Sequence, residues 1–288
     1  MYFAVDAASV PDITAKLVEL IEASPKANWT AVVDRAFDHG RTPYTYPGFP
    51  EALYACDDLD ALMEVSPLLI PLNTRQPESL QSQLWDLVEH CSGRPMLSLV
   101  ASAKTAKELL PNWQKCVRVV TTDRQKLMLR FTDTRVLPAL AEILCEESWA
   151  ALTHELTAWW YVDRSGSLAQ IEPVAADVPP RFPILVDKRE FNRLMDWGEP
   201  DAVIDAIFTQ RPAMLPAAGK AAFFDRIAAV CKFAREKEIE SFPDVVSLGM
   251  FDALVKGRAL TNPKLLNLVA ERGWKEGQMM EALTNLID

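Results

Sequence analysis

A strand ends and a helix begins within Arg130-Phe131-Thr132-Asp133-Thr134-Arg135-Val136-Leu137. The residues leading into it, 126–131, have the composition of a strand. Pro138 suits the first turn of a helix predicted over residues 134–144, because its missing N–H would have no helical partner there. Asp133 lies in the polar turn between them, where a carboxylate can accept hydrogen bonds from the first N–H groups of the helix. The junction therefore predicts a strand followed directly by a helix, as in layered α/β domains.

Strand and helix signals alternate along the chain on both sides of this junction. Apolar residues at helical spacing recur between short apolar runs that end in turn residues. We expect helices near residues 13–21, 59–65, 80–91 and 102–113, the last capped by Ser102, and strands over 29–33, 68–72, 96–101, 117–120, 126–131, 158–162 and 167–171. This order predicts an α/β fold class, with an N-terminal layered domain over residues 1–172 in which helices flank a mixed sheet.

The pattern changes after residue 172. Four prolines follow in a short stretch, at Pro173, Pro179, Pro180 and Pro183. Because proline stiffens a chain and removes backbone donors, we expect a proline-rich linker over residues 173–186. Residues 187–288 carry apolar stripes at helical spacing, and Asp187 and Glu190 have the spacing of a capping box. We therefore predict an all-helical C-terminal domain, a bundle of about five or six short helices.

The composition indicates a globular protein with a hydrophobic core. Of the 288 residues, 49% are hydrophobic and 24% are charged, which is ordinary for a folded chain. The formal net charge is −10 and the pI is near 5.0, and an acidic surface repels the phosphates of nucleic acids. Lysine and arginine are scattered among carboxylates, without a basic patch. We therefore expect no nucleic-acid partner.

Cysteine usage and hydropathy favour the cytoplasm. The five cysteines are odd in number, widely spaced and without a Cys-x-x-Cys pair, which fits reduced thiols. The first residues, Met1 to Asp6, lack the basic start and long apolar run of a signal peptide. No window approaches the roughly 18 apolar residues of a membrane span. We expect a cytoplasmic protein that does not cross a membrane.

The sequence lacks the motifs of several common catalytic and nucleotide sites. Gly-x-x-x-x-Gly-Lys-Ser/Thr, Gly-x-Gly-x-x-Gly and Gly-x-Ser-x-Gly do not occur. His39, His90 and His154 lack the spacing of metal ligands, and His90 suits a helix end, where a cationic ring complements the dipole. Asp38-His39-Gly40 is better explained as a polar loop than as a metal or base site, and Asp57-Asp58-Leu59-Asp60 as a helix start. We expect no catalytic residue, cofactor, metal or small-molecule substrate.

Two arginines and two aspartates remain as candidates for binding a protein partner: Arg130, Asp133, Arg135 and Asp34. Asp34 ends the strand predicted over residues 29–33, and the two arginines are close enough in sequence to pair with Asp133. A capped and ion-paired junction would account for these residues. Alternatively, the arginines form a binding edge, because ligands of open α/β sheets gather at the carboxyl ends of strands. Both interpretations stay open.

The junction resembles the Arg-Phe-x-Asp-x-Arg-Val-Leu signature of the adaptor-chaperone family of bacterial type VI secretion. Four more segments match in the order that the family has: Trp29 to Asp34, Val65 to Leu72, Thr122 to Leu129 and Ala158 to Trp160. The resemblance covers roughly residues 29–163. Thr132 and Thr134 depart from the family, which often has an aromatic residue and a proline beside the aspartate.

The resemblance implies a function in the cytoplasm. Such proteins bind a specific toxic effector and help attach it to the VgrG-type spike protein before the secretion sheath contracts, and binding needs no cofactor. We therefore expect an adaptor-chaperone and not an enzyme, with an effector and a spike as protein partners. Two alternatives are an α/β enzyme that uses Asp34, His39 and Asp133, and an immunity protein that inhibits a toxin directly.

Overall fold

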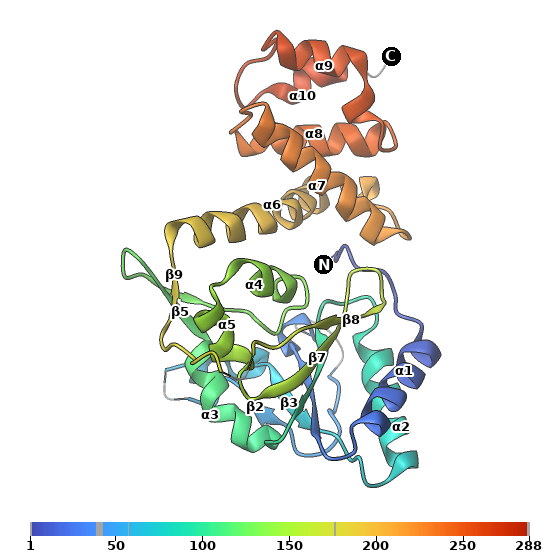
Figure 1. The fold of residues 1–288 in the computed structure, drawn as a ribbon. Coiled ribbons are helices and arrows are strands. Elements are labelled where there is room, and N and C mark those ends of the chain that lie inside the picture. Colours follow the sequence, from blue (N-terminus) through green and yellow to red (C-terminus); the bar gives the residue numbers. More distant parts are fainter. Residues whose placement is uncertain (1, 39–42, 57, 176, 287–288) are drawn as a thin grey trace. The chain divides into compact units, whose positions relative to one another are not determined.

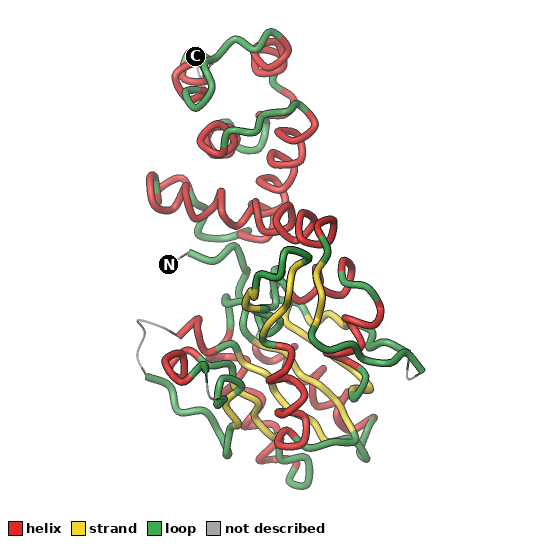
Figure 2. The backbone as a smooth tube through the Cα atoms, turned by 90° about the vertical axis from the view of Figure 1, so that its left-hand side faces the viewer, coloured by secondary structure: helices red, strands yellow, loops and turns green. Residues whose placement is uncertain are grey.

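The structure is a computed structural model that describes residues 2–38, 43–56, 58–175 and 177–286 (Figures 1 and 2). His39 and Asp57, considered above as site residues, lie outside these ranges. The chain divides into two compact units. We call Val5–Leu194 the α/β unit, and Met195–Asp288 together with Met1–Ala4 the helical unit.

A six-stranded sheet in the order β2-β3-β1-β4-β7-β8 forms the centre of the α/β unit. Every pair of neighbouring strands in it is antiparallel. The strands are β1 (Asn28–Val33), β2 (Glu51–Ala52), β3 (Leu68–Pro71), β4 (Leu97–Ser102), β7 (Leu156–Val162) and β8 (Leu168–Ile171). The central strands β1 and β4 are buried almost throughout, as expected for strands that are covered on both faces.

Five α-helices pack around this sheet: α1 (Val10–Ala23), α2 (Pro77–Cys91), α3 (Ala106–Cys116), α4 (Leu137–Ile143) and α5 (Glu146–Thr153). In Figure 1, α1 and α2 lie on one side of the sheet and α3 on the other. Tryptophans fill the core beside α3 and α5. The ring of Trp159 from β7 stacks on Trp113 at 5.4 Å and on Trp149 at 6.0 Å between ring centroids. Trp159 of the predicted 158–162 strand thus contributes directly to the main core.

Helix α3 begins later than we expected, and its cap is Thr105 instead of Ser102. The backbone N–H and the hydroxyl of Thr105 both donate to Glu108 Oε2 at 2.8 Å, as in a capping box. Ser102 is the last residue of β4, and its hydroxyl donates to the carbonyl oxygen of Glu155 at 2.6 Å. The prediction for Ser102 was therefore wrong, because the strand continues through it.

A second, three-stranded sheet has the order β6-β5-β9, with β5 (Arg118–Thr121), β6 (Lys126–Met128) and β9 (Ile184–Val186). Strand β5 pairs antiparallel with β6 and parallel with β9. The α/β fold class, followed by an all-helical region, is thus confirmed. Mixed pairing occurs in this smaller sheet, however, and the main sheet is antiparallel throughout.

The division into units differs from the predicted boundaries. Ile184 and Val186 of β9 are buried in the α/β unit, although we had placed them at the end of a linker over residues 173–186. The prolines therefore precede a strand, and the division falls after Leu194, inside a helix. That helix, α6 (Lys188–Gln210), begins with the predicted capping box, since Asp187 and Glu190 each accept a hydrogen bond from the other's backbone N–H, at 2.7 and 2.8 Å.

The helical unit contains most of α6 together with α7 (Lys220–Glu236), α8 (Phe242–Leu254), α9 (Pro263–Ala270) and α10 (Met279–Thr284). Helix α8 is buried over most of its length. Gly249 permits this close packing, because a Cβ atom there would lie 3.0 Å from Cγ1 of Val203. Tyr2 also belongs to this unit, and its ring stacks 6.5 Å from that of Phe208. None of the described helices is long and apolar enough to cross a membrane.

Candidate functional site

Asp34 follows β1 directly and is buried, with 1% of its surface exposed. Its Oδ2 accepts hydrogen bonds from Arg130 Nη2 at 2.9 Å and from the hydroxyl of Thr132 at 3.0 Å. Burial raises the pKa of Asp34 above its ordinary value, and the charge of Arg130 offsets this only in part. The carboxylate thus anchors residues 130–132 to the end of the central strand.

Asp133 is the second buried carboxylate, with 2% exposed. Arg135 binds it with both ends of the guanidinium fork, through Nε to Oδ1 at 3.0 Å and through Nη2 to Oδ2 at 2.8 Å. Oδ1 also accepts the backbone N–H of Arg135 at 3.0 Å. The carboxylate therefore closes the turn and does not cap α4, which begins one residue after Val136. It is the carbonyl oxygen of Asp133 that accepts the N–H groups of Val136 and Leu137.

Phe37 joins the two arginines. It belongs to the 3₁₀-helix η1 (Arg35–Asp38), and its ring is buried. The guanidinium carbon of Arg130 lies 5.0 Å from the ring centroid, and that of Arg135 lies 5.3 Å from it, within the range of cation–π attraction. Burial alone would lower the pKa of Arg130, but the charges of Asp34 and Asp133 raise it. Two permanent cations thus share one aromatic ring above two buried acids.

We call Arg130 and Arg135 the arginine pair. The side chain of Arg130 is 40% exposed and that of Arg135 is 20% exposed, whereas their aspartates are almost inaccessible. A guanidinium carries five N–H donors, and the hydrogen bond of Arg130 to Asp34 uses Nη2 alone. Arg130 is therefore suited to bind a carboxylate from outside, while Asp34 and Asp133 hold the two arginines in position.

All four predicted site residues meet in one place, but the pairing differs from the sequence interpretation. Arg130 pairs with Asp34 and not with its neighbour Asp133. Phe37 and Thr132 complete the site, although neither was predicted to be a site residue. Thr132 had only been noted as a departure from the family signature. A buried hydroxyl that donates to Asp34 gives this threonine a structural role.

A second polar cluster surrounds Asp38 at the end of η1. The carboxylate accepts hydrogen bonds from Tyr46 and Arg94, and His90 Nε2 lies 3.0 Å from Oδ1. The ring of Tyr44 stacks on His90 with 3.7 Å between centroids. Although burial raises the pKa of Asp38, the hydrogen bonds from His90 and Tyr46 outweigh it and lower the pKa to about 2.

This cluster corrects the interpretation of His90, which we had assigned to a helix end alone. It lies in the last turn of α2, but its ring is held by an acid from another element. His39 lies outside the described residues, so the enzyme alternative with Asp34, His39 and Asp133 has no complete geometry. Within the ranges that the structure covers, no group of three or more His, Cys, Asp or Glu residues could hold a metal ion. Burial raises the pKa of the thiols of Cys91 and Cys116 to about 12, so both are neutral.

Residues 29–151 match DUF4123, a domain of unknown function. The matched range contains both polar clusters, β1 except for its first residue, and the strands β2 to β6, and it ends within α5. Neither the curated proteins nor the solved structures contain a significant match. The likeness to a known family thus falls on the part of the chain that carries the arginine pair.

Proposed function

We propose that this chain is an adaptor-chaperone of bacterial type VI secretion. It binds one toxic effector in the cytoplasm and helps attach it to a VgrG-type spike, without catalysing a reaction and without a cofactor. The motif resemblance over roughly residues 29–163 and the DUF4123 match over residues 29–151 support this proposal, because they fall on the same region.

The observation that carries the proposal is the construction of the arginine pair. Its two guanidinium groups are held on Phe37 by buried acids, which lowers the entropy that they would lose on binding. Fixed guanidinium groups recognise carboxylates in a bidentate geometry. Such an arrangement suits a protein surface that receives an acidic side chain. We infer that this acidic side chain belongs to the effector or the spike.

The experiment is co-expression of the chain with the spike and effector encoded beside it, followed by affinity purification and a measurement of Kd. We expect a stable complex with at least one of them. The double variant Arg130→Lys/Arg135→Lys keeps both positive charges above the buried aspartates but removes the planar forks. We expect it to weaken the complex about ten-fold while the thermal midpoint changes little.

The matched control is Arg75→Lys, at an exposed position of the same unit. It should leave Kd unchanged. If neither spike nor effector is captured, the proposed function is wrong. If the complex forms and the double variant binds as tightly as the control, the adaptor function is supported, but the arginine pair has no role in binding. Capture of the effector without any spike contact would instead favour an immunity protein.

A further inference from the structure

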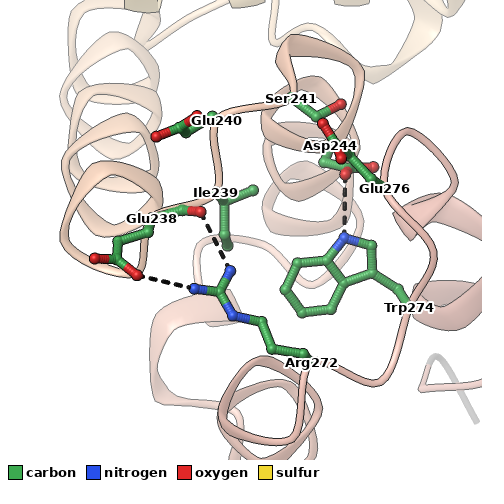
Figure 3. A pocket seen from close by; sticks show the side chains of 8 residues that line it. All are labelled: Glu238, Ile239, Glu240, Ser241, Asp244, Arg272, Trp274 and Glu276. Atoms are coloured by element: carbon green, nitrogen blue, oxygen red, sulfur yellow. Dashed lines mark hydrogen bonds and ion pairs between the residues drawn. The ribbon is translucent and has the colours of Figure 1, made fainter.

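A pocket of about 230 Å³ lies in the helical unit, between the end of α7, the start of α8 and the loop that joins α9 to α10 (Figure 3). Small-molecule pockets usually measure about 300–1,000 Å³. The smaller volume suits a single side chain better than a whole metabolite. The pocket is also outside the DUF4123 match, so the function of that domain does not explain it.

The aromatic wall of this pocket is fixed in advance. The indole N–H of Trp274 donates to Oδ2 of Asp244 at 3.1 Å. Asp244 is 1% exposed and also accepts the backbone N–H groups of Gly277 at 2.8 Å and Met279 at 2.9 Å. One buried carboxylate thus holds the loop and its tryptophan ring against the start of α8. These groups therefore lose little conformational entropy when a ligand binds.

A guanidinium group of the chain itself already lies in the pocket. Arg272 donates to the backbone carbonyl of Glu238 at 3.2 Å and to its carboxylate at 3.4 Å, as Figure 3 shows. Its guanidinium carbon is 5.8 Å from the ring centroid of Trp274. An aromatic face, a carbonyl oxygen and a carboxylate are the groups that bind arginine side chains in proteins. The contacts of Arg272 therefore indicate which chemistry the pocket accommodates.

The pocket has more acids than this one cation neutralises. Glu240 and Glu276 are exposed lining residues, and within the described part of the chain neither takes part in an ion pair. Arg272 is already engaged with Glu238, and Asp244 is enclosed by its three donors. Two carboxylates at the mouth of a pocket with an aromatic wall thus lack a cation.

We infer that this pocket receives an arginine side chain from a partner protein. The guanidinium lies against the Trp274 wall, and the carboxylates of Glu240 and Glu276 pair with it. Arginine suits the pocket better than lysine because its planar group stacks on an indole and binds a carboxylate through two N–H groups at once. The inference rests on the proposed function only in that a protein partner exists.

The test uses the full-length chain labelled with ¹⁵N and three blocked tripeptides, acetyl-Gly-Arg-Gly-amide and its lysine and citrulline analogues. Citrulline keeps the shape of arginine without its charge. We expect the arginine peptide to shift the indole N–H resonance of Trp274, identified by its loss in Trp274→Phe. The lysine peptide should bind several-fold more weakly, and the citrulline peptide should produce no saturable shift.

The variant Glu240→Gln/Glu276→Gln removes both rim charges at exposed positions and should fold normally. We expect it to bind the arginine peptide about three- to ten-fold more weakly. Its control, Glu271→Gln/Glu281→Gln, removes two exposed charges that do not line the pocket and should bind normally.

Three results would overturn the inference: no saturable shift with the arginine peptide, equal shifts with citrulline, or equal affinity of the two double variants. If calcium chloride alone shifts the Trp274 resonance and excess calcium prevents the shift caused by the arginine peptide, the ligand would be a divalent cation and not an arginine. The peptides need no secretion partner. A failed capture of spike and effector with intact peptide binding therefore rejects the proposed function alone, and the reverse result rejects the pocket alone.

Discussion

Asp34 and Asp38 lie at the two ends of one short segment, yet their environments shift their pKa values in opposite directions. Asp34 is almost fully buried, and the resulting rise in its pKa exceeds what Arg130 and Thr132 can offset. Asp38 is 15% exposed and receives hydrogen bonds from His90 and Tyr46, so its pKa falls to about 2. The difference shows that burial, which raises the pKa of a carboxyl group, competes with hydrogen-bond donors, which lower it. The ionised form of Asp38 favours the fold, whereas that of Asp34 costs stability and serves to position an arginine.

The largest effect on stability is expected when Asp38 is removed. Asp38→Ala leaves Arg94, which is 5% exposed, without its acid. We expect the free energy of unfolding to fall by about 3 kcal/mol, because a lone buried charge is costly. Chemical denaturation at neutral pH measures it. Glu19→Ala, at an exposed site of α1, is the control and should change stability by less than about 0.5 kcal/mol. A loss at Asp38 no larger than the control's would contradict the account of this cluster.

As pH falls, the contributions of the two aspartates to the free energy of unfolding should change in opposite directions. The pKa of Asp38 is lower in the folded state than its ordinary value of 3.8. Its contribution is therefore fully present above about pH 4 and is lost as pH falls through about 2, by about 2 kcal/mol in total. The pKa of Asp34 is raised, so its protonation favours the folded state as pH falls. We expect Asp38→Asn to flatten the loss of stability in acid and Asp34→Asn to steepen it, as measured by denaturation at stepped pH. Equal slopes in both variants would refute the opposite shifts.

The smallest effect is expected for Asp34→Asn at neutral pH. An amide of the same shape can still accept from the hydroxyl of Thr132 and avoids the burial of a charge. We expect a change in the free energy of unfolding of less than about 1 kcal/mol. The orientation of Arg130 should suffer more than stability, so partner affinity should fall while the thermal midpoint holds. A loss of stability as large as that of Asp38→Ala would mean that the two acids do not differ in the way described.

Local sequence patterns predicted the local structure of the site, but they did not predict pairings between residues that are distant in the sequence. Helix α2, strand β1 and the Asp187–Glu190 capping box follow from apolar spacing and cap residues, which act over a few positions. The pairing of Arg130 with Asp34 depends on how β1 and the 130–137 junction meet in the sheet. No spacing rule contains that information, so Asp133, the nearer acid in sequence, was the natural but incorrect partner for Arg130.

Strand β9 shows the same limit. It has three residues and follows a group of prolines, so its own signal is weaker than that of the linker we predicted. It becomes a strand because β5 offers a parallel edge and the core accepts Ile184 and Val186. His90 is similar, since the sequence predicted its position at a helix end but not its contact with Asp38.

The position of β7 has a consequence for dividing this protein into fragments. The family match ends at residue 151, before β7 begins, but β7 pairs with β4 along most of its length and supplies Trp159 to the core. A fragment cut at that limit would carry β4 as a bare apolar edge, which invites pairing between chains. Expressed alone, it should aggregate. The smallest part of the α/β unit that keeps this edge covered must extend through β7, whatever limits sequence similarity gives to the domain.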